Sequence, residues 1–170
     1  SGMRIILVGK GKTMYFLAKR FQARNFRVTV ITPDQVEATT LSRSLDALIL
    51  LGDGTTPALL NDAEAGRADA LVAIMPRDED NLVACQIAQR MFQVPQVVAL
   101  VNDPENSALF RQVGIEGTFS SADLLARLIE ERTTVAEVMT LVPLAEGRAH
   151  VTEVRLPEGA PASGLSLIHI

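Results

Sequence analysis

The stretch "ILVGKGKTM" (residues 6–14) decides the fold of this chain. An apolar run ends at two glycines, Gly9 and Gly11, and an amphipathic pattern begins directly after them. A strand, a tight glycine turn and a helix in this order are typical of the first unit of a nucleotide-binding sheet, in which free helix N–H groups face a phosphate. The stretch therefore predicts an α/β protein with an anion site at the glycine turn.

Two glycine motifs compete for this turn. Gly11-Lys12-Thr13 ends like a Walker A loop, but that loop requires a glycine at position 6, where this chain has Ile. The dinucleotide pattern G-x-G-x-x-G fits Gly9 and Gly11, and its third glycine is replaced by Met14, a larger side chain expected to push the helix outward or cover the site. A turn without a ligand is the alternative. The residues expected at a dinucleotide-type site here are Gly9, Lys10, Gly11, Lys12, Thr13 and Met14, with the lysines adding favourable charge.

The same rhythm continues along the chain. Strand-length apolar segments lie at 3–8, 27–32, 47–51, 70–75, 96–101 and 117–119, and helical patterns lie at 12–24, 34–44, 57–64, 78–93, 104–113 and 121–133. Sequential β-helix-β units need right-handed crossovers, so this order predicts a doubly wound, Rossmann-like parallel sheet of about six strands with helices on both faces. A length of 170 residues with 48% hydrophobic residues suits one full core.

The pattern changes near residue 134. We expect a nucleotide-binding domain over 3–134, and over 135–164 a connector with a short β extension that begins a truncated C-terminal subdomain. The last six residues, 165–170, can be encoded by the mosaic end of a transposon used in sequencing libraries. They are therefore expected to be a non-native terminus.

Polar residues follow the other strands. Ligands of doubly wound sheets bind outside the carboxyl ends of the strands, and an acid at the end of the second strand usually binds the ribose hydroxyls. Thr32 stands at that position, and no Arg follows to hold a 2′-phosphate, so NADP is disfavoured. An adenine nucleotide is expected, with NAD, NADH, AMP, ADP and ATP all open. The further residues expected to bind it are Thr32, Asp34, Asp53, Gly54, Met75, Arg77 and Asn81.

Composition excludes several classes. A net charge of −4 without a basic cluster argues against a nucleic-acid partner. No apolar run approaches the roughly 18 to 20 residues of a membrane span, so direct membrane insertion is not expected. The one cysteine, Cys85, cannot form an internal disulfide, which favours the cytoplasm. Asp78, Glu79 and Asp80 are adjacent and cannot all face one way on a helix, so no metal site is predicted.

The sequence places no candidate catalytic residue in the predicted ligand crevice. Tyr15-x-x-x-Lys19 matches a short-chain reductase pair formally, but it lies in the first helix, away from a cofactor's reactive ring. His150 and His169 lie in the C-terminal segment, and Cys85 fits a buried hydrophobic position. The chain is therefore predicted not to be an enzyme. A ligand-free interaction scaffold remains an alternative, and an NAD-dependent oxidoreductase is the least favoured one.

The stretch "GDGTTPALLNDAEAGRADALVAIMPRDEDNLVACQIA" (residues 52–88), with the glycine turn, resembles the RCK family, the TrkA-N type of nucleotide-binding domain that regulates potassium transport. The resemblance covers about 3–134. It implies a cytoplasmic Rossmann domain that forms dimers or rings beneath a membrane-embedded potassium channel or transporter. It also implies binding of NAD(H), ATP, ADP or AMP, and gating of transport through rearrangement of the homo-oligomer.

Carried over residue by residue, Gly9 and Gly11 match the first two glycines of the family loop, and Gly52-Asp53 matches its acidic turn after the third strand. Met14 and Thr32 depart from the commonest pattern. Residues 150–164 resemble the start of the TrkA-C subdomain that usually follows.

Overall fold

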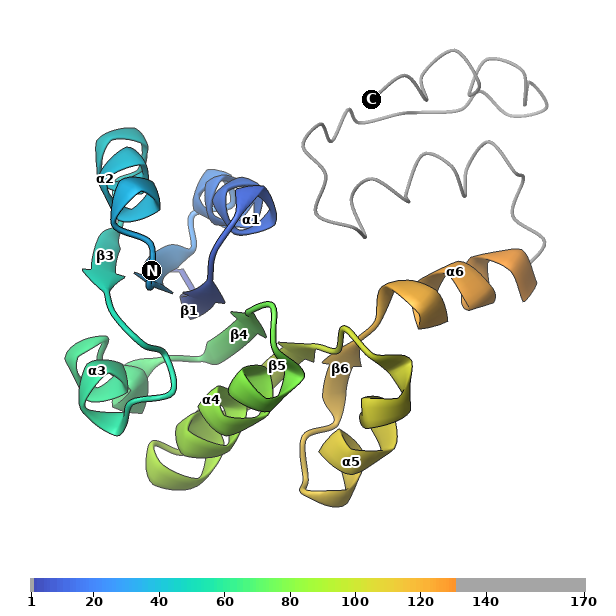
Figure 1. The fold of residues 1–170 in the computed structure, drawn as a ribbon. Coiled ribbons are helices and arrows are strands. Elements are labelled where there is room, and N and C mark those ends of the chain that lie inside the picture. The colour runs from blue at the N-terminus through green and yellow to red at the C-terminus, as the bar shows by residue number, and fades with distance from the viewer. Residues whose placement is uncertain (1, 131–170) are drawn as a thin grey trace, which may run out of the picture. The chain divides into compact units, whose positions relative to one another are not determined.

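The computed structural model of the chain describes residues 2–130 (Figure 1). Its contacts divide the chain into a first unit that ends at Phe119 and a second unit that begins at Ser120. Of the second unit the structure describes α6 (Ser121–Glu130), which begins at the predicted residue. The predicted domain boundary near 134 and the segments 135–164 and 165–170 lie outside the described residues.

The first unit is built on one parallel sheet of six strands in the order β3-β2-β1-β4-β5-β6. The strands are β1 (Arg4–Gly9), β2 (Arg27–Thr32), β3 (Leu48–Leu51), β4 (Ala70–Ile74), β5 (Gln96–Leu100) and β6 (Gly117–Phe119). Every neighbouring pair is parallel, and β1 pairs with both β2 and β4. The predicted doubly wound sheet is confirmed.

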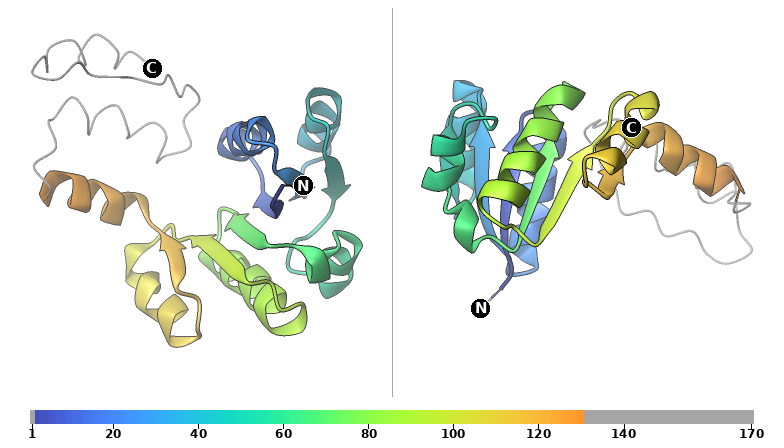
Figure 2. Two further views of the ribbon diagram at one scale, coloured as in Figure 1. Left: turned by 180° about the vertical axis from the view of Figure 1, so that it is seen from behind. Right: turned by 90° about the horizontal axis from the view of Figure 1, so that it is seen from below.

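Helices cover both faces of this sheet. They are α1 (Lys12–Ala23), α2 (Gln35–Ser44), α3 (Pro57–Asp62), α4 (Asp78–Met91) and α5 (Ser107–Gln112), with the short 3-10 turns η1 (Ala65–Arg67) and η2 (Pro104–Asn106). Figures 1 and 2 show α1 and α2 on one face and α3, α4 and α5 on the other. No helix within residues 2–130 is long and apolar enough to cross a bilayer.

The central strand β1 (RIILVG) is a continuous apolar run after Arg4 because both of its faces are buried. In β1, Ile6 and Val8 enter the cluster under α4 and α5, whereas Ile5 and Leu7 enter the cluster under α1 and α2. Successive side chains of a strand point to opposite faces of the sheet. When helices cover both faces, nearly every side chain of the strand is buried and therefore apolar. The core is thereby split into two layers, and the carboxyl ends of the strands meet along one edge.

Candidate functional site

Gly9 and Gly11 form the turn between β1 and α1 for two different reasons. A Cβ at Gly9 would lie 2.9 Å from the carbonyl oxygen of Ile74, so only glycine lets β1 pass this close to β4. Gly11 has φ +101°, and a Cβ there would meet no atom within 4 Å. Sheet packing therefore requires Gly9, whereas Gly11 is set by backbone conformation and leaves open space beside it.

The first turn of α1 has no side-chain cap. Gly11 is the N-cap residue and makes no capping hydrogen bond, and no acidic residue lies in the first turn. The first amides of a helix have no partner within the helix, and together they carry the positive end of its dipole. Lys10 and Lys12 are exposed beside them, and Thr13 is half-buried. Among residues 2–130 no side chain pairs with the Lys12 and Thr13 amides, so the turn offers these N–H groups and positive charge to an anion.

Met14 does not cover this turn. Its side chain is completely buried and packs under α1 in the cluster that contains Leu7, Val30 and Leu41. The thioether thus fills core space where a third glycine would bring helix and strand closer. Only the backbone of Met14 is available to a ligand.

Glu37, which the sequence did not single out, lies across the glycine turn. Its Oε2 accepts a hydrogen bond from the Gly11 N–H at 2.6 Å, and its Oε1 accepts one from the Thr32 hydroxyl at 3.1 Å. Thr32 is completely buried at the end of β2. Asp34 caps α2, because its Oδ1 accepts from the Val36 and Glu37 amides. The carboxylate nearest the turn therefore comes from the first turn of α2.

Asp53 and Gly54 form a tight turn after β3. The Asp53 carboxylate accepts from the Thr55 hydroxyl at 2.6 Å and from the Thr55 amide at 2.8 Å. These two bonds, the side-chain one first, hold the pKa of Asp53 below its usual value. Gly54 is buried, and any side chain there would collide with Val8 of β1. Local hydrogen bonds and packing thus account for the residue types at Asp53 and Gly54. Asp53 is nevertheless exposed at the carboxyl edge of the sheet.

Asn81 is a structural residue in the described molecule. It is fully buried, and its Oδ1 accepts from the Met75 amide at 2.7 Å. Its Nδ2 donates to the carbonyl oxygens of Met75 and Leu100, both at 2.9 Å. Asn81 therefore joins the ends of β4 and β5. Met75 is buried as well, whereas Arg77 is exposed and pairs with Glu79 at 3.2 Å.

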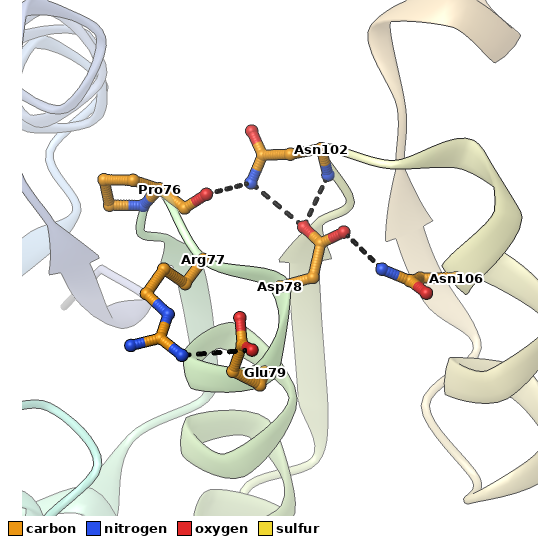
Figure 3. A network of polar contacts seen from close by, with 6 residues as sticks. All are labelled: Pro76, Arg77, Asp78, Glu79, Asn102 and Asn106. Atoms are coloured by element: carbon orange, nitrogen blue, oxygen red, sulfur yellow. Dashed lines mark hydrogen bonds and ion pairs between the residues drawn. The ribbon is translucent and has the colours of Figure 1, made fainter.

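Asp78 fastens the loop after β5 to the start of α4 (Figure 3). Its Oδ1 accepts from the backbone and side-chain nitrogens of Asn102 at 2.6 and 3.0 Å, and its Oδ2 accepts from the Asp103 amide and Asn106 Nδ2 at 2.9 and 2.8 Å. Burial opposes ionisation of Asp78, but the four hydrogen bonds outweigh it, so its pKa lies below the usual value. The sequence did not reveal this role.

The described residues assemble no metal or nucleophile site. Within 2–130, no three His, Cys, Asp or Glu side chains are grouped so as to hold a metal ion. Cys85 is buried, its thiol donates to the Val98 carbonyl at 3.7 Å, and burial raises its pKa to about 12. Such a thiol is unreactive near neutral pH. Lys19 Nζ lies 5.2 Å from the centre of the Tyr15 ring, a cation–π contact within α1.

Comparison with known proteins identifies the family. The TrkA-N domain model matches residues 5–121. A Trk system potassium uptake protein TrkA of Mycobacterium tuberculosis is 31% identical over 165 residues, which cover 95% of this chain and 74% of that protein. A TrkA homolog of Methanothermobacter thermautotrophicus is 29% identical over 154 residues, which cover 91% of this chain and 71% of the homolog.

Solved structures share the fold. The GsuK channel bound to NAD superposes with a TM-score of 0.66 at 22% identity, over 76% of this chain and 23% of the channel chain. GsuK bound to ADP has a TM-score of 0.66 at 17% identity, over 94% of this chain and 47% of that chain. The chain thus spans less than half of either solved chain. Since the family model matches residues 5–121, which include the glycine turn and all of the sheet except Arg4, the chain belongs to the TrkA-N domain family.

Proposed function

We propose that this chain binds an adenine nucleotide at the glycine turn and serves as a cytoplasmic regulatory part of a potassium transport system. The observation that carries the proposal is the uncapped start of α1 at Gly11, at the carboxyl edge of the sheet. The names of the relatives, which are potassium uptake proteins, and the NAD and ADP in two similar structures support it.

In this proposal the phosphates lie against the amides of Lys12 and Thr13. A helix N-terminus stabilises an anion through its free N–H groups, and the exposed ammonium groups of Lys10 and Lys12 add charge. The adenosine lies toward Thr32, Asp34, Asp53 and Gly54. The second half of a dinucleotide would lie toward Met75 and Arg77, and Asn81 would support that side by holding Met75 in place.

Regulation requires a second arrangement of the molecule. A ligand shifts a conformational equilibrium only when its affinity differs between the two states. We propose that the chain forms a homo-oligomer beneath a membrane-embedded potassium channel or transporter, and that nucleotide binding favours one arrangement of it. No residue of the proposed site has a catalytic task in this scheme, so the chain acts as a regulator and not as an enzyme.

A ligand-free scaffold is the second candidate. One observation favours it: the Glu37 carboxylate already accepts the Gly11 N–H that a nucleotide could use. In that case the glycine turn would be satisfied within the chain. The chain would then act only through its surface.

Thermal unfolding with NADH, NADPH, AMP, ADP and ATP separates the two candidates. A ligand present at 100 times its dissociation constant stabilises the folded state by about 2.7 kcal/mol, which shifts the midpoint by several degrees. Lys12→Gln should weaken the shift for every nucleotide, because a charge beside the phosphates is lost. Lys19→Gln, which removes an exposed charge farther along α1, is the matched control. An unchanged midpoint with all five compounds would leave only the scaffold.

A further inference from the structure

We propose that Glu37 supplies the ribose-binding carboxylate that Thr32 lacks, and that it thereby selects an adenosine whose ribose hydroxyls are free. The inference rests on the proposed function, since it names the residue that would read the ribose in that site. It is drawn from two hydrogen bonds of one carboxylate. Glu37 accepts from the Thr32 hydroxyl at the end of β2 and from the amide of Gly11.

The local geometry of α2 explains why Glu37 points at the glycine turn. Glu37 is the third residue of α2, where a glutamate commonly turns back to bind the N–H of the N-cap residue. Here the N-cap residue is Asp34, and its N–H donates to the Thr32 hydroxyl at 3.2 Å. Thr32 in turn donates its own proton to Glu37. The threonine thus satisfies the cap and directs the carboxylate outward.

A threonine suits this task better than the usual acid. An aspartate at position 32 could not donate to Glu37, and two carboxylates at this distance would repel each other. The departure at Thr32 and the placement of Glu37 are therefore two parts of one arrangement. The proposed ribose-binding carboxylate thus comes from α2 and not from the end of β2.

The carboxylate lies where the ribose is held in dinucleotide-binding sheets. There the acid stands between the end of the second strand and the turn after the first. In this chain β1 and β2 are paired neighbours up to Val8 and Ile31, and Glu37 contacts the residue that ends β2 and the turn that follows β1. Glu37 is half-buried and Gly11 is exposed with open space beside it, so a ligand can reach both.

The main competing role is that of an internal anion which fills the phosphate position. Of the amides at the glycine turn, however, Glu37 accepts only that of Gly11, and its other oxygen accepts from the Thr32 hydroxyl. Among residues 2–130 no side chain caps the amides of Lys12 and Thr13. A phosphate and the Glu37 carboxylate can therefore use different N–H groups. A carboxylate accepts hydrogen bonds from two ribose hydroxyls, and it repels a 2′-phosphate.

Binding of two matched ligand pairs to the folded chain tests the inference. The pairs are ADP with 2′,3′-dideoxy-ADP, and NADH with NADPH, measured by calorimetry or thermal shift. The wild-type protein should prefer the first member of at least one pair by about tenfold or more, as expected for hydrogen bonds to a charged group. Glu37→Gln, which keeps shape but removes charge, should reduce that preference to about threefold or less. Glu64→Gln removes the same charge from an exposed residue that pairs with Arg4 at the start of β1, and it should leave the preference unchanged.

Each other outcome overturns the inference in a recognisable way. If the wild type binds nucleotide but Glu37→Gln keeps the same preferences, another group reads the ribose and the proposed function stands. If Glu37→Gln binds all four ligands more tightly by a common factor, the carboxylate is a competing anion. If the wild type binds none of them, the proposed function fails, and the inference fails with it.

Discussion

Gly11 adopts a backbone conformation that is strained for any residue with a Cβ. Its φ of 101° and ψ of 175° lie in a region that is almost confined to glycine, and occupying it costs a side-chain-bearing residue about 1–3 kcal/mol. Because a Cβ would meet no atom within 4 Å, this backbone strain is the whole cost of adding one. The turn therefore depends on conformation and not on space.

Gly11→Ala should lower the free energy of unfolding by about 1–3 kcal/mol, or shift the turn and lose the Glu37 contact. Chemical denaturation measures the first effect, and the amide resonance of residue 11 reports the second. Gly66→Ala is the matched control, since Gly66 also has open space around it but no left-handed φ. It should be neutral or stabilising by up to about 1 kcal/mol. Equal losses in the two variants would contradict the strain argument.

The site residues were predictable where a strand end fixes them and unpredictable where a long side chain crosses between elements. Gly11 and Thr32 follow directly from strand ends in the sequence. Glu37 could not be placed, because a glutamate at the third position of a helix ordinarily serves its own cap. The local hydrogen bond from the Asp34 amide to the Thr32 hydroxyl replaces that task, and the contact of Glu37 with the Gly11 amide joins segments 26 residues apart, which the sequence does not show. The sequence signal was an Asp cap followed three residues later by Glu.

At the scale of elements, one buried carboxylate fastens the loop after β5 to the start of α4. Asp78 opens α4 and accepts two backbone and two side-chain hydrogen bonds from the segment 102–106. Glu79 lies in the same acidic first turn of α4 but is exposed, where a carboxylate interacts favourably with the positive end of the helix dipole. Asp78 differs because it organises a neighbouring loop. The loop that follows β5 is thereby fastened to the start of α4.

Asp78→Ala should lower the free energy of unfolding at pH 7 by about 2–3 kcal/mol, because four partly buried hydrogen bonds to a charged carboxylate are lost. Glu79→Ala, which removes only an exposed ion pair with Arg77, should cost at most about 1 kcal/mol. Urea denaturation of both variants checks this. A loss in Asp78→Ala no larger than that in Glu79→Ala would show that the network adds little to stability.

The same carboxylate makes part of the stability depend on pH. The pKa of Asp78 is lower in the folded protein than its ordinary value, so its contribution is fully present above the unfolded pKa of about 4 and is lost as the pH falls through the folded value. The stability difference between wild type and Asp78→Ala should therefore shrink as the pH is lowered from 7 to below about 4. This comparison belongs to the same denaturation series.

At the scale of the whole first unit, the sheet order determines where the proposed site lies. β1 lies between β2 and β4, and the chain crosses from one side of β1 to the other after β3. Ligands of doubly wound sheets bind where the strand order reverses in this way. The sheet was predictable because short, mostly apolar segments alternate with helical patterns, which the sequence shows directly. The division of the chain after Phe119 was not predictable, because the helical pattern that follows it resembles the five earlier helical patterns.

Hydrogen exchange should distinguish how much of this crevice a ligand uses. In the proposed site ADP contacts only the half built by β1 and β2, so it should slow exchange in residues 9–14 and 32–37 and leave 75–81 and 102–106 unchanged. NADH carries a second nucleoside and should slow exchange in residues 75–78 as well, beside the exposed Arg77. Mass spectrometry of peptides from the two complexes, at matched saturation, makes the comparison. The segment 102–106 serves as an internal control, because Asp78 already holds it in the free protein. Identical protection by ADP and NADH would show that the site holds one nucleoside only. The proposed ligand would then be a mononucleotide and not a dinucleotide.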